Sequence, residues 1–497
     1  MGATLLLLPL ITSLVLAVVS TVAGRAVVRL SGVAASAVVL TCGVGLLVAG
    51  APAPQLGGGL LRADALSAFM LTVIGAVGVT ATWGGLAPRD DGSAPSRHER
   101  RYAALVCVFL GAMSLAVITD NLGVLWVAVE ATTIATAFLV GHQGTRRALE
   151  AAWKYVVLGS VGVAIALLGV VLLYAASRSA GDATLSWTAL VSGELPLDAG
   201  LVKVAAGLAV LGFATKAGLA PLHSWLPDAH SQAPAPVSGL MSGVLLAVAF
   251  YAILRVQAVA DVVLGPDLMR GLLLTAGLGS LTVAAALVLR QRDYKRMLAY
   301  SSIEHMGLLA LGAAVGGPLA LAAVLLHVLG HGLAKAGLFV VAGRILAAEG
   351  TTTVADVRGL LARRPDLAVP FVAGMAALLG FPPFALFFSE VGIVVAGWRA
   401  GLGAAMGLAV VLLLVLFAGL ARATATMVLG PARGEVVVGA EVVVGAEVVA
   451  GSGAAHGSSV GPTTPLVLAL AVTAVVGFLA TPVAGVLTRA AQAVGGW

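Results

Sequence analysis

Fourteen long apolar segments, joined by short polar connections, constrain this chain more than any other feature of its sequence. A helix needs about 20 mostly apolar residues to cross the hydrocarbon core of a bilayer. The segments that meet this length lie near residues 3–22, 27–50, 66–86, 103–119, 122–142, 156–176, 200–221, 236–254, 271–289, 300–316, 319–343, 368–397, 402–425 and 464–487. The pattern predicts an all-α polytopic membrane protein with about 14 transmembrane helices.

The composition excludes a soluble enzyme. Only 10% of the 497 residues are charged, whereas a soluble domain carries about 25% charged residues. The two cysteines, Cys42 and Cys107, lie in apolar segments, and an iron–sulfur cluster needs about four cysteine ligands. We therefore expect no redox centre in this chain. The basic residues are scattered between apolar segments and form no single stripe, so nucleic acid is not an expected partner.

The basic residues of the connections divide unevenly between the two sides of the membrane. Summed over alternate connections, nineteen Lys and Arg fall on one side and seven on the other. The seven are Arg62, Arg178, Lys203, Arg255, Arg270, Arg399 and Arg489. Because basic residues concentrate in cytoplasmic loops, we expect the side with nineteen to face the cytoplasm and both termini to lie outside.

A low-complexity segment precedes the last apolar segment. From Glu435 the chain repeats EVVVGA, EVVVGA and EVVAGS, which places a carboxylate in every unit and prevents a clean transmembrane helix. A cytoplasmic linker over residues 429–463 is the favoured interpretation, and a partner-binding arm is the alternative. The flanking regions are expected to be helices 1–3 over residues 1–102 and helix 14 over residues 464–497.

Charged residues lie in the middle of three apolar segments, at Glu130, Lys216 and Lys335. A charge at membrane depth costs roughly 2.5–3.5 kcal/mol, so such residues usually line a water path or pair with one another. Of the 28 basic residues only five are Lys, yet both mid-segment positions are Lys. A buried Lys can release its proton, whereas Arg stays charged. We interpret these residues as members of an ion pathway; a structural carboxylate and chance are the alternatives.

Two apolar segments are interrupted. Gly218 and Pro221 interrupt the seventh just after Lys216, and the sequence GFPPFALFFSE interrupts the twelfth before Glu390. Backbone groups freed by such breaks are satisfied only against protein or a water-filled cavity, and breaks in corresponding halves indicate a transport pathway between inverted repeats. We predict two inverted five-helix repeats with broken helices 7 and 12. They are expected to span residues 103–254 (helices 4–8) and 255–428 (helices 9–13).

His327, His331 and Lys335 follow at steps of four, so they form one polar stripe along an otherwise apolar helix. Such a stripe suits a proton wire, and helix-packing hydrogen bonds are the alternative. An i, i+4 pair of histidines can also hold zinc, but HVLGH lacks the Glu of the HExxH motif and no other ligand is evident. We therefore expect no metal site.

Six further residues are weaker candidates. Glu304 and His305 follow the basic sequence RQRDYKRM and are expected either in the pathway or at the membrane interface. Lys154 is expected to be a topology charge more readily than a relay member. Three residues after the seventh segment are possible points of proton uptake near the cytoplasmic surface, with helix capping as the alternative: His223, Asp228 and His230.

These motifs resemble the proton-translocating antiporter-like subunits of respiratory complex I, Mrp cation/proton antiporters and membrane-bound hydrogenases. The resemblance covers roughly residues 60–430 and rests on three stretches. They are TKAGLAPLHSWLPDAHSQAPAPVSGLMSGVLL from Thr215, YKRMLAYSSIEHMGLLALG from Tyr294 and LLHVLGHGLAKAGLFVVAGRI from Leu325. YSSIEHMG and HSQAPAPVS look most like the hydrogenase 4 component F branch, and the M-type subunit of complex I is next.

The resemblance implies roles for individual residues. A Glu on the fifth helix pairs with a Lys on the broken seventh in that family, matching Glu130 and Lys216. The family's polar axis continues through the eleventh helix, matching the stripe that ends at Lys335, to Glu390 on the broken twelfth. One position departs from the pattern: M-type subunits commonly carry a Lys on the eighth helix where this chain has Ala247.

The resemblance also implies a function. We expect a proton-translocating subunit of a membrane-bound oxidoreductase complex in the cytoplasmic membrane of a bacterial cell, with nickel–iron and iron–sulfur centres in partner subunits. Its expected partners are other membrane and peripheral subunits and the lipid bilayer. The alternatives are an M-type subunit of complex I, an Mrp-like cation/proton antiporter subunit and a scaffold that no longer conducts.

Overall fold

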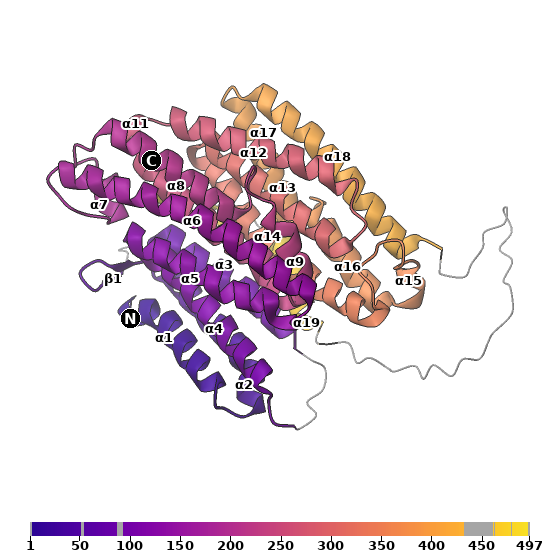
Figure 1. Cartoon of the computed structure of the whole chain (residues 1–497). Coiled ribbons are helices and arrows are strands. Elements are labelled where there is room, and N and C mark those ends of the chain that lie inside the picture. The colour runs from indigo at the N-terminus through magenta and orange to yellow at the C-terminus, as the bar shows by residue number, and fades with distance from the viewer. Residues whose placement is uncertain are drawn as a thin grey trace, which may run out of the picture.

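The computed structural model describes residues 2–50, 54–86, 93–431, 461, 463–478 and 480–495 (Figure 1). These residues are almost entirely helical, with one two-stranded antiparallel hairpin. The elements are α1 (Gly2–Ser20), α2 (Arg25–Ala49), β1 (Gln55–Leu56), β2 (Leu61–Arg62), α3 (Ala65–Gly84), α4 (Arg97–Ile118), α5 (Leu122–Val140), η1 (Gly141–Gln143), α6 (Arg146–Ser179), α7 (Trp187–Val191), α8 (Ala199–Ala217), α9 (Trp225–Gln232), α10 (Ala235–Leu240), η2 (Met241–Leu245), α11 (Leu246–Leu264), α12 (Asp267–Val288), α13 (Tyr294–Val315), α14 (Gly317–Glu349), α15 (Leu360–Arg363), α16 (Pro365–Leu378), α17 (Ala385–Arg399), α18 (Gly403–Leu429), α19 (Thr464–Phe478) and α20 (Ala480–Gly495).

The apolar segments form the predicted helices. In the part of the chain that the structure describes, twelve helices are long and apolar enough to cross a membrane. Two shorter apolar helices, α16 and α19, are present as well, and each is followed along the chain by another short helix, α17 and α20 respectively. This architecture confirms the prediction of an all-α polytopic membrane protein.

The helices differ in how deeply they are buried in the bundle. The most apolar windows of α13 and of the α10–α11 segment are wholly buried, whereas only 22% of the α1 and α18 windows are buried. In Figure 1, α1 and α18 lie at opposite sides of the molecule, with α14 between them. The polar residues of the predicted stripe therefore lie on a helix at the centre of the protein.

Both predicted breaks are present. Helix α8 ends at Gly218, whose φ of 75° is the left-handed conformation that favours glycine, and the chain resumes as α9. The second break lies between α16 and α17, where Gly380 has a φ of 67°. The broken helices 7 and 12 of the sequence analysis are thus confirmed. The domain boundaries drawn at residues 102, 254 and 428 stay predictions.

The segment that contains Ala247 has an unusual turn. Helices α10 and α11 are joined without interruption by η2, a π-helical turn. At this turn the backbone of Gly243 lies against that of Gly332 on α14, so that a Cβ on Gly243 would meet the Gly332 carbonyl oxygen at 2.7 Å. Glycine at both positions allows the two central helices to approach closely. The EVVVGA repeat from Glu435 lies outside the described residues.

Candidate functional site

Lys216 lies in the last turn of α8 and is fully buried. Its ammonium group donates a hydrogen bond of 2.8 Å to the Thr133 hydroxyl on α5 and another to the Tyr155 hydroxyl on α6. It also lies over the Tyr155 ring, 4.4 Å from its centroid. These contacts replace part of the hydration that the charge loses in the membrane.

Glu130 lies one turn before Thr133 on α5 and is only partly buried. Its carboxylate accepts hydrogen bonds from the hydroxyls of Thr133 (3.2 Å) and Ser160 (3.1 Å). The Thr133 hydroxyl thus donates to Glu130 while it accepts from Lys216. The structure brings the predicted pair together, but through one hydroxyl and without a direct ion pair among the described contacts.

The residues after the break occupy different environments. Asp228 is partly exposed and forms ion pairs of 3.2 Å with both Lys154 and Arg296. The pair with Asp228 ties Lys154 on α6 to α9, and Lys154 also pairs with Glu150 on its own helix at 2.7 Å. These contacts agree with a surface location, and the proton-uptake role of Asp228 and the partly exposed His223 stays a prediction.

His230 is not near the surface as expected, because its side chain is fully buried. Its Nδ1 lies 2.9 Å from the carbonyl oxygen of Leu226, and its Nε2 has no hydrogen-bond partner in the described part of the chain. The ring packs between Trp225 and Phe339, at centroid distances of 6.1 Å and 5.8 Å. The break turns α9 back into the bundle and carries His230 inward.

Lys335 forms the centre of a second polar cluster, on α14. It is fully buried and donates hydrogen bonds of 2.5 Å to the carbonyl oxygen of Leu298 and the hydroxyl of Ser301, both on α13. Glu304 lies one turn beyond Ser301 on α13 and is 7% exposed. This burial within the protein agrees with a place beside Lys335, and the position of Glu304 relative to the membrane interface stays a prediction.

Three histidines continue this second cluster. His305 Nδ1 lies 3.0 Å from His327 Nε2, and His327 Nδ1 lies 3.0 Å from the Ser389 hydroxyl. The rings of His305 and His331 are 4.8 Å apart between centroids. Ser389 precedes Glu390 on α17. His305 from α13 thus connects with the α14 stripe, and it is buried in the protein like Glu304, while its position relative to the membrane interface stays a prediction.

One group of side chains in the described residues has a spacing that could hold a metal ion. The donor atoms of His305, His327 and Glu390 all lie within 4.8 Å of one another. The two imidazoles, however, already form a hydrogen bond with each other, as members of a proton relay would. The expectation that the chain holds no metal stays a prediction.

Aromatic side chains lie between the two clusters. Tyr155, which contacts Lys216, packs on Trp225 at 4.9 Å between centroids, and Trp225 leads to His230. Ala247 supplies no titratable group to this region. Lys295, which sequence reasoning placed in a basic loop, is buried nearby, and its ammonium donates a 3.0 Å hydrogen bond to the Ala233 carbonyl.

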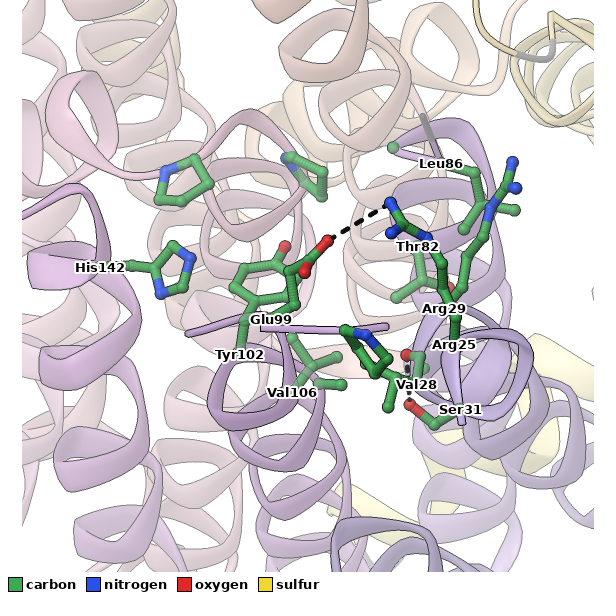
Figure 2. A pocket seen from close by; sticks show the side chains of 16 residues that line it. Arg25, Val28, Arg29, Ser31, Thr82, Leu86, Glu99, Tyr102, Val106 and His142 are labelled. Atoms are coloured by element: carbon green, nitrogen blue, oxygen red, sulfur yellow. Dashed lines mark hydrogen bonds and ion pairs between the residues drawn. The ribbon is translucent and has the colours of Figure 1, made fainter. Parts of the chain in front are cut away.

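A cavity of about 360 Å³ lies apart from both clusters, between α2, α3 and α4 (Figure 2). Arg25, Arg29 and Glu99 line it together with apolar side chains such as Val28 and Val106. Glu99 lies 3.8 Å from the Arg25 guanidinium. None of the residues predicted to form the pathway lines this cavity.

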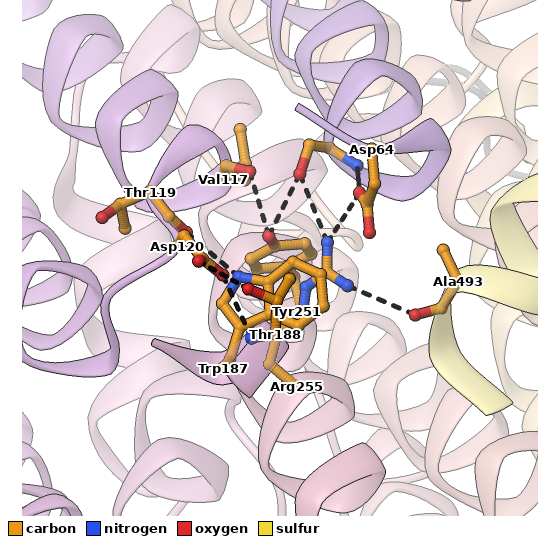
Figure 3. A network of polar contacts seen from close by, with 10 residues as sticks. Asp64, Val117, Thr119, Asp120, Trp187, Thr188, Tyr251, Arg255 and Ala493 are labelled. Carbon is orange, nitrogen blue, oxygen red and sulfur yellow. Dashed lines mark hydrogen bonds and ion pairs between the residues drawn. The ribbon is translucent and has the colours of Figure 1, made fainter. Parts of the chain in front are cut away.

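Figure 3 shows a buried arginine that sequence reasoning placed in a connection. Arg255 lies within α11 and pairs with Asp64 at 2.7 Å. Its guanidinium also lies 3.8 Å from the centroid of the Trp187 ring and donates to the carbonyl of Ala493 on α20. Burial raises the pKa of the Asp64 carboxyl, but the charge and hydrogen bonds of Arg255 outweigh it, so the pKa lies below its ordinary value.

Comparison with known proteins identifies relatives of the chain. It is 43% identical over 296 residues to the hydrogenase-4 component F homolog of Methylacidiphilum infernorum, covering 59% of this chain and 62% of that protein. It is 35% identical over 318 residues to NADH-quinone oxidoreductase subunit N of Desulforudis audaxviator, covering 63% and 62%. The chain thus spans a little under two thirds of the length of these curated relatives.

Solved structures share the whole fold. A chain of the membrane-bound sulfane sulfur reductase, an archaeal respiratory membrane complex, superposes with a TM-score of 0.83 at 25% identity, covering 99% of this chain and 97% of that one. A chain of the Mrp complex from Dietzia has a TM-score of 0.81 at 22% identity and shows the fold alone, covering 99% and 97%.

The sequence profile of one family matches residues 119–416. Because this match covers more than half of the residues, the chain belongs to the NADH:quinone oxidoreductase/Mrp antiporter transmembrane family.

Proposed function

We propose that this chain is the proton-translocating subunit of a membrane-bound oxidoreductase complex of the hydrogenase 4 type. The observation that carries the proposal is a series of proton-exchanging groups on α13, α14 and α17, all buried except the partly buried Glu390 at its end. It begins at Lys335 and Ser301, continues past Glu304 through three histidines, and ends at Ser389 and Glu390. Buried titratable groups in a membrane usually mark an ion path, and so many in contact fit a relay better than helix packing alone.

The first cluster, Glu130 and Lys216, responds to changes of charge elsewhere in the complex. With one hydroxyl between them, Glu130 and Lys216 are in a separated state. Direct contact of the carboxylate would favour the protonated amine, and separation would favour release of its proton. A charge change in the redox arm of the complex drives this opening and closing.

The released proton passes toward the second cluster by way of the buried His230, whose ring packs between Trp225, which contacts Tyr155 beside Lys216, and Phe339, which lies one turn after Lys335 on α14. A neutral imidazole accepts a proton on one nitrogen and donates from the other. His331, His305 and His327 therefore pass the proton on toward Glu390 without moving the helices. Asp228 and His223 collect protons at the side where the basic loops lie, and Lys154 holds Asp228 in place through their ion pair.

The electron-transfer chemistry belongs to other subunits in this proposal. The names of the relatives, hydrogenase-4 component F homolog and NADH-quinone oxidoreductase subunit N, support a multi-subunit oxidoreductase. Its nickel–iron and iron–sulfur centres lie in partner chains, and this chain holds no cofactor. The complex lies in the cytoplasmic membrane of a bacterial cell, and both termini of this chain face outside.

The first experiment isolates the complex from gently solubilised native membranes through a tag on this chain and identifies every co-purifying protein. A nickel–iron hydrogenase-like large subunit with iron–sulfur proteins is the expected result. Recovery of small membrane subunits alone, with no redox protein, would contradict the proposal.

The second experiment measures proton uptake by inverted membrane vesicles while the complex turns over. Lys216→Ala should abolish coupled uptake and leave electron transfer largely intact. Lys203→Ala is the matched control, because Lys203 is an exposed lysine on the same helix. Unchanged uptake in Lys216→Ala vesicles would overturn the mechanism.

A cation/proton antiporter subunit is the second candidate, favoured by the match of residues 119–416 to a family that includes Mrp antiporters. Such a subunit would give sodium-dependent proton flux in proteoliposomes that contain no redox partner. An M-type subunit of complex I would instead co-purify with an NADH-oxidising arm. The isolation experiment separates these candidates from the hydrogenase 4 type.

A further inference from the structure

At the start of α4, arginines and apolar side chains share one face of the helix, and none of them belongs to the proposed proton pathway. Six residues of this helix line a groove of about 430 Å³ beside Thr21 at the end of α1. Successive members of the six are alternately three positions and one position apart in the sequence. They are Arg97, Arg100, Arg101, Ala104, Leu105 and Val108. This spacing places all six on one face of the helix.

This face changes character along the helix. Three arginines lie in its first turn and a half, and the apolar residues lie deeper in the membrane segment. With a rise of about 1.5 Å per residue, Val108 lies roughly 10 Å beyond Arg101 along the helix axis. Val108 is 41% exposed on the outer face of the bundle. The groove thus has a cationic end at the membrane surface and an apolar wall at the depth of acyl chains.

The arginines are held in place without a carboxylate. Arg100 donates hydrogen bonds of 3.3 Å to the carbonyl oxygens of Thr21 and Pro95, and the Arg101 guanidinium lies 4.7 Å from the centroid of the Phe138 ring. No carboxylate within the described ranges forms an ion pair with these three arginines or lines the groove. Within the described residues, no carboxylate therefore offsets their positive charge at this site.

The neighbouring cavity of Figure 2 provides a contrast on the other side of the same helix. There Glu99 lies 3.8 Å from Arg25 and offsets its charge. Both sites contain arginines, but among their described lining residues the cavity includes a carboxylate, whereas the α4 groove combines three arginines with an apolar wall. An anionic headgroup with an attached acyl chain matches the groove and not the cavity.

We propose that the groove between α1 and the start of α4 binds an anionic phospholipid. Its phosphate contacts Arg97, Arg100 and Arg101, and an acyl chain lies along Leu105 and Val108. Clusters of basic residues next to membrane helices attract anionic lipids, and the guanidinium group matches phosphate oxygens in a bidentate geometry. The site is independent of the proposed proton pathway, and its failure would leave that pathway untouched.

The test compares two double variants of the tagged complex. Arg97→Gln/Arg101→Gln removes two cations from the groove. Arg146→Gln/Arg147→Gln removes two exposed arginines from the start of α6, so it changes the net charge equally at another helix start on the same side. Lipids retained through purification are quantified by mass spectrometry, and spin-labelled phosphatidylglycerol and phosphatidylcholine are titrated into each complex in detergent.

The groove variant should bind phosphatidylglycerol about 20-fold more weakly than the unmodified complex, whereas phosphatidylcholine binding should not change. The control variant should retain normal phosphatidylglycerol binding. Equal losses in both variants would overturn the proposal, because they would reveal only a general charge effect. Inorganic phosphate is added as a competitor: displacement at concentrations near those of the lipid would show a soluble-anion site instead.

Discussion

The two lysines in the middle of apolar segments, Lys216 and Lys335, have different surroundings. Lys216 lies beside a helix break and reaches its carboxylate partner through the single hydroxyl of Thr133. Lys335 lies in the middle of the uninterrupted α14, held by a carbonyl and the Ser301 hydroxyl, with histidines one and two turns away. A link through one hydroxyl is broken by a small displacement, whereas the second cluster has several contacts. The difference indicates a switch in the first half and a conductor in the second.

The carboxylates near the two lysines, Glu130 and Glu304, also differ from each other in burial. Glu130 is partly exposed on α5, whose neighbouring Val127 and Ile134 are 55% and 57% exposed. Glu304 is buried within α13. A carboxylate near the surface of the bundle can sense charges outside the chain, and an enclosed one responds mainly to its own neighbours.

After the complete loss expected for Lys216→Ala, the largest effect should come from removing the amine of Lys335 in the second cluster. Lys335→Met should reduce coupled proton uptake roughly a hundredfold, because a positioned proton-transfer group contributes at least that much. The measurement is the initial rate of proton uptake in inverted vesicles at matched electron-transfer rates. Lys203→Met serves as the control. Retention of more than half the uptake would show that the second cluster is structural.

Replacing the histidine that joins α13 to α14 should have the next largest effect. His305→Gln can keep a hydrogen bond to His327 but cannot pass a proton by protonation, so uptake should fall about tenfold. His98→Gln, at an exposed position on α4, controls for the loss of any histidine. An unaffected rate would place the route outside the three-histidine cluster.

Removing the Thr133 hydroxyl that joins Glu130 to Lys216 should reduce proton uptake less than the two preceding variants do. Thr133→Val removes the one group that joins Glu130 to Lys216, and we expect uptake to fall about threefold to tenfold, the value of one net hydrogen bond. Thr133→Ser restores the hydroxyl and should restore most of the rate. If Ser and Val variants behaved alike, the methyl group and not the hydroxyl would matter.

The smallest effect is expected from adding a lysine to the region between the clusters. Ala247→Lys restores the residue found in M-type subunits, and if His230 already carries protons across, uptake should change about twofold or less. The assay is again vesicle uptake, with a His230→Gln background as the comparison. Rescue of that background by Ala247→Lys would establish that the two positions serve the same step.

Sequence alone was enough to select the candidate residues whose charge conflicts with an apolar sequence around them. A Glu or Lys within 20 apolar residues stands out, so Glu130, Lys216 and Lys335 could be selected without a structure. Thr133 could not, because a threonine in a membrane helix is common and its role depends on a lysine 83 residues away.

Three buried residues, His230, Lys295 and Arg255, were expected from the sequence to lie near the surface or in connections, and they share one reason for the difference. His230 and Lys295 lie in polar stretches that look like surface loops, and only the packing of α9 against α13 shows that they are buried. Arg255 lies near the end of an apolar segment, and its partner Asp64 is 191 residues away. Local composition indicates where a helix ends, but it does not show which neighbouring element covers that end.

The π-helical turn at Met241–Leu245 has a consequence for every residue that follows it on the same helix. A π turn contains one residue more than an α turn, and each residue advances an α-helix by about 100° around its axis. The turn therefore sets the angular phase of α11. Without it, Arg255 would point about a quarter of a turn away from Asp64, and the aromatic and acidic groups gathered around that guanidinium would face an aliphatic surface. The residue accommodated in this turn thus determines an ion pair that lies nearly three helical turns further along α11.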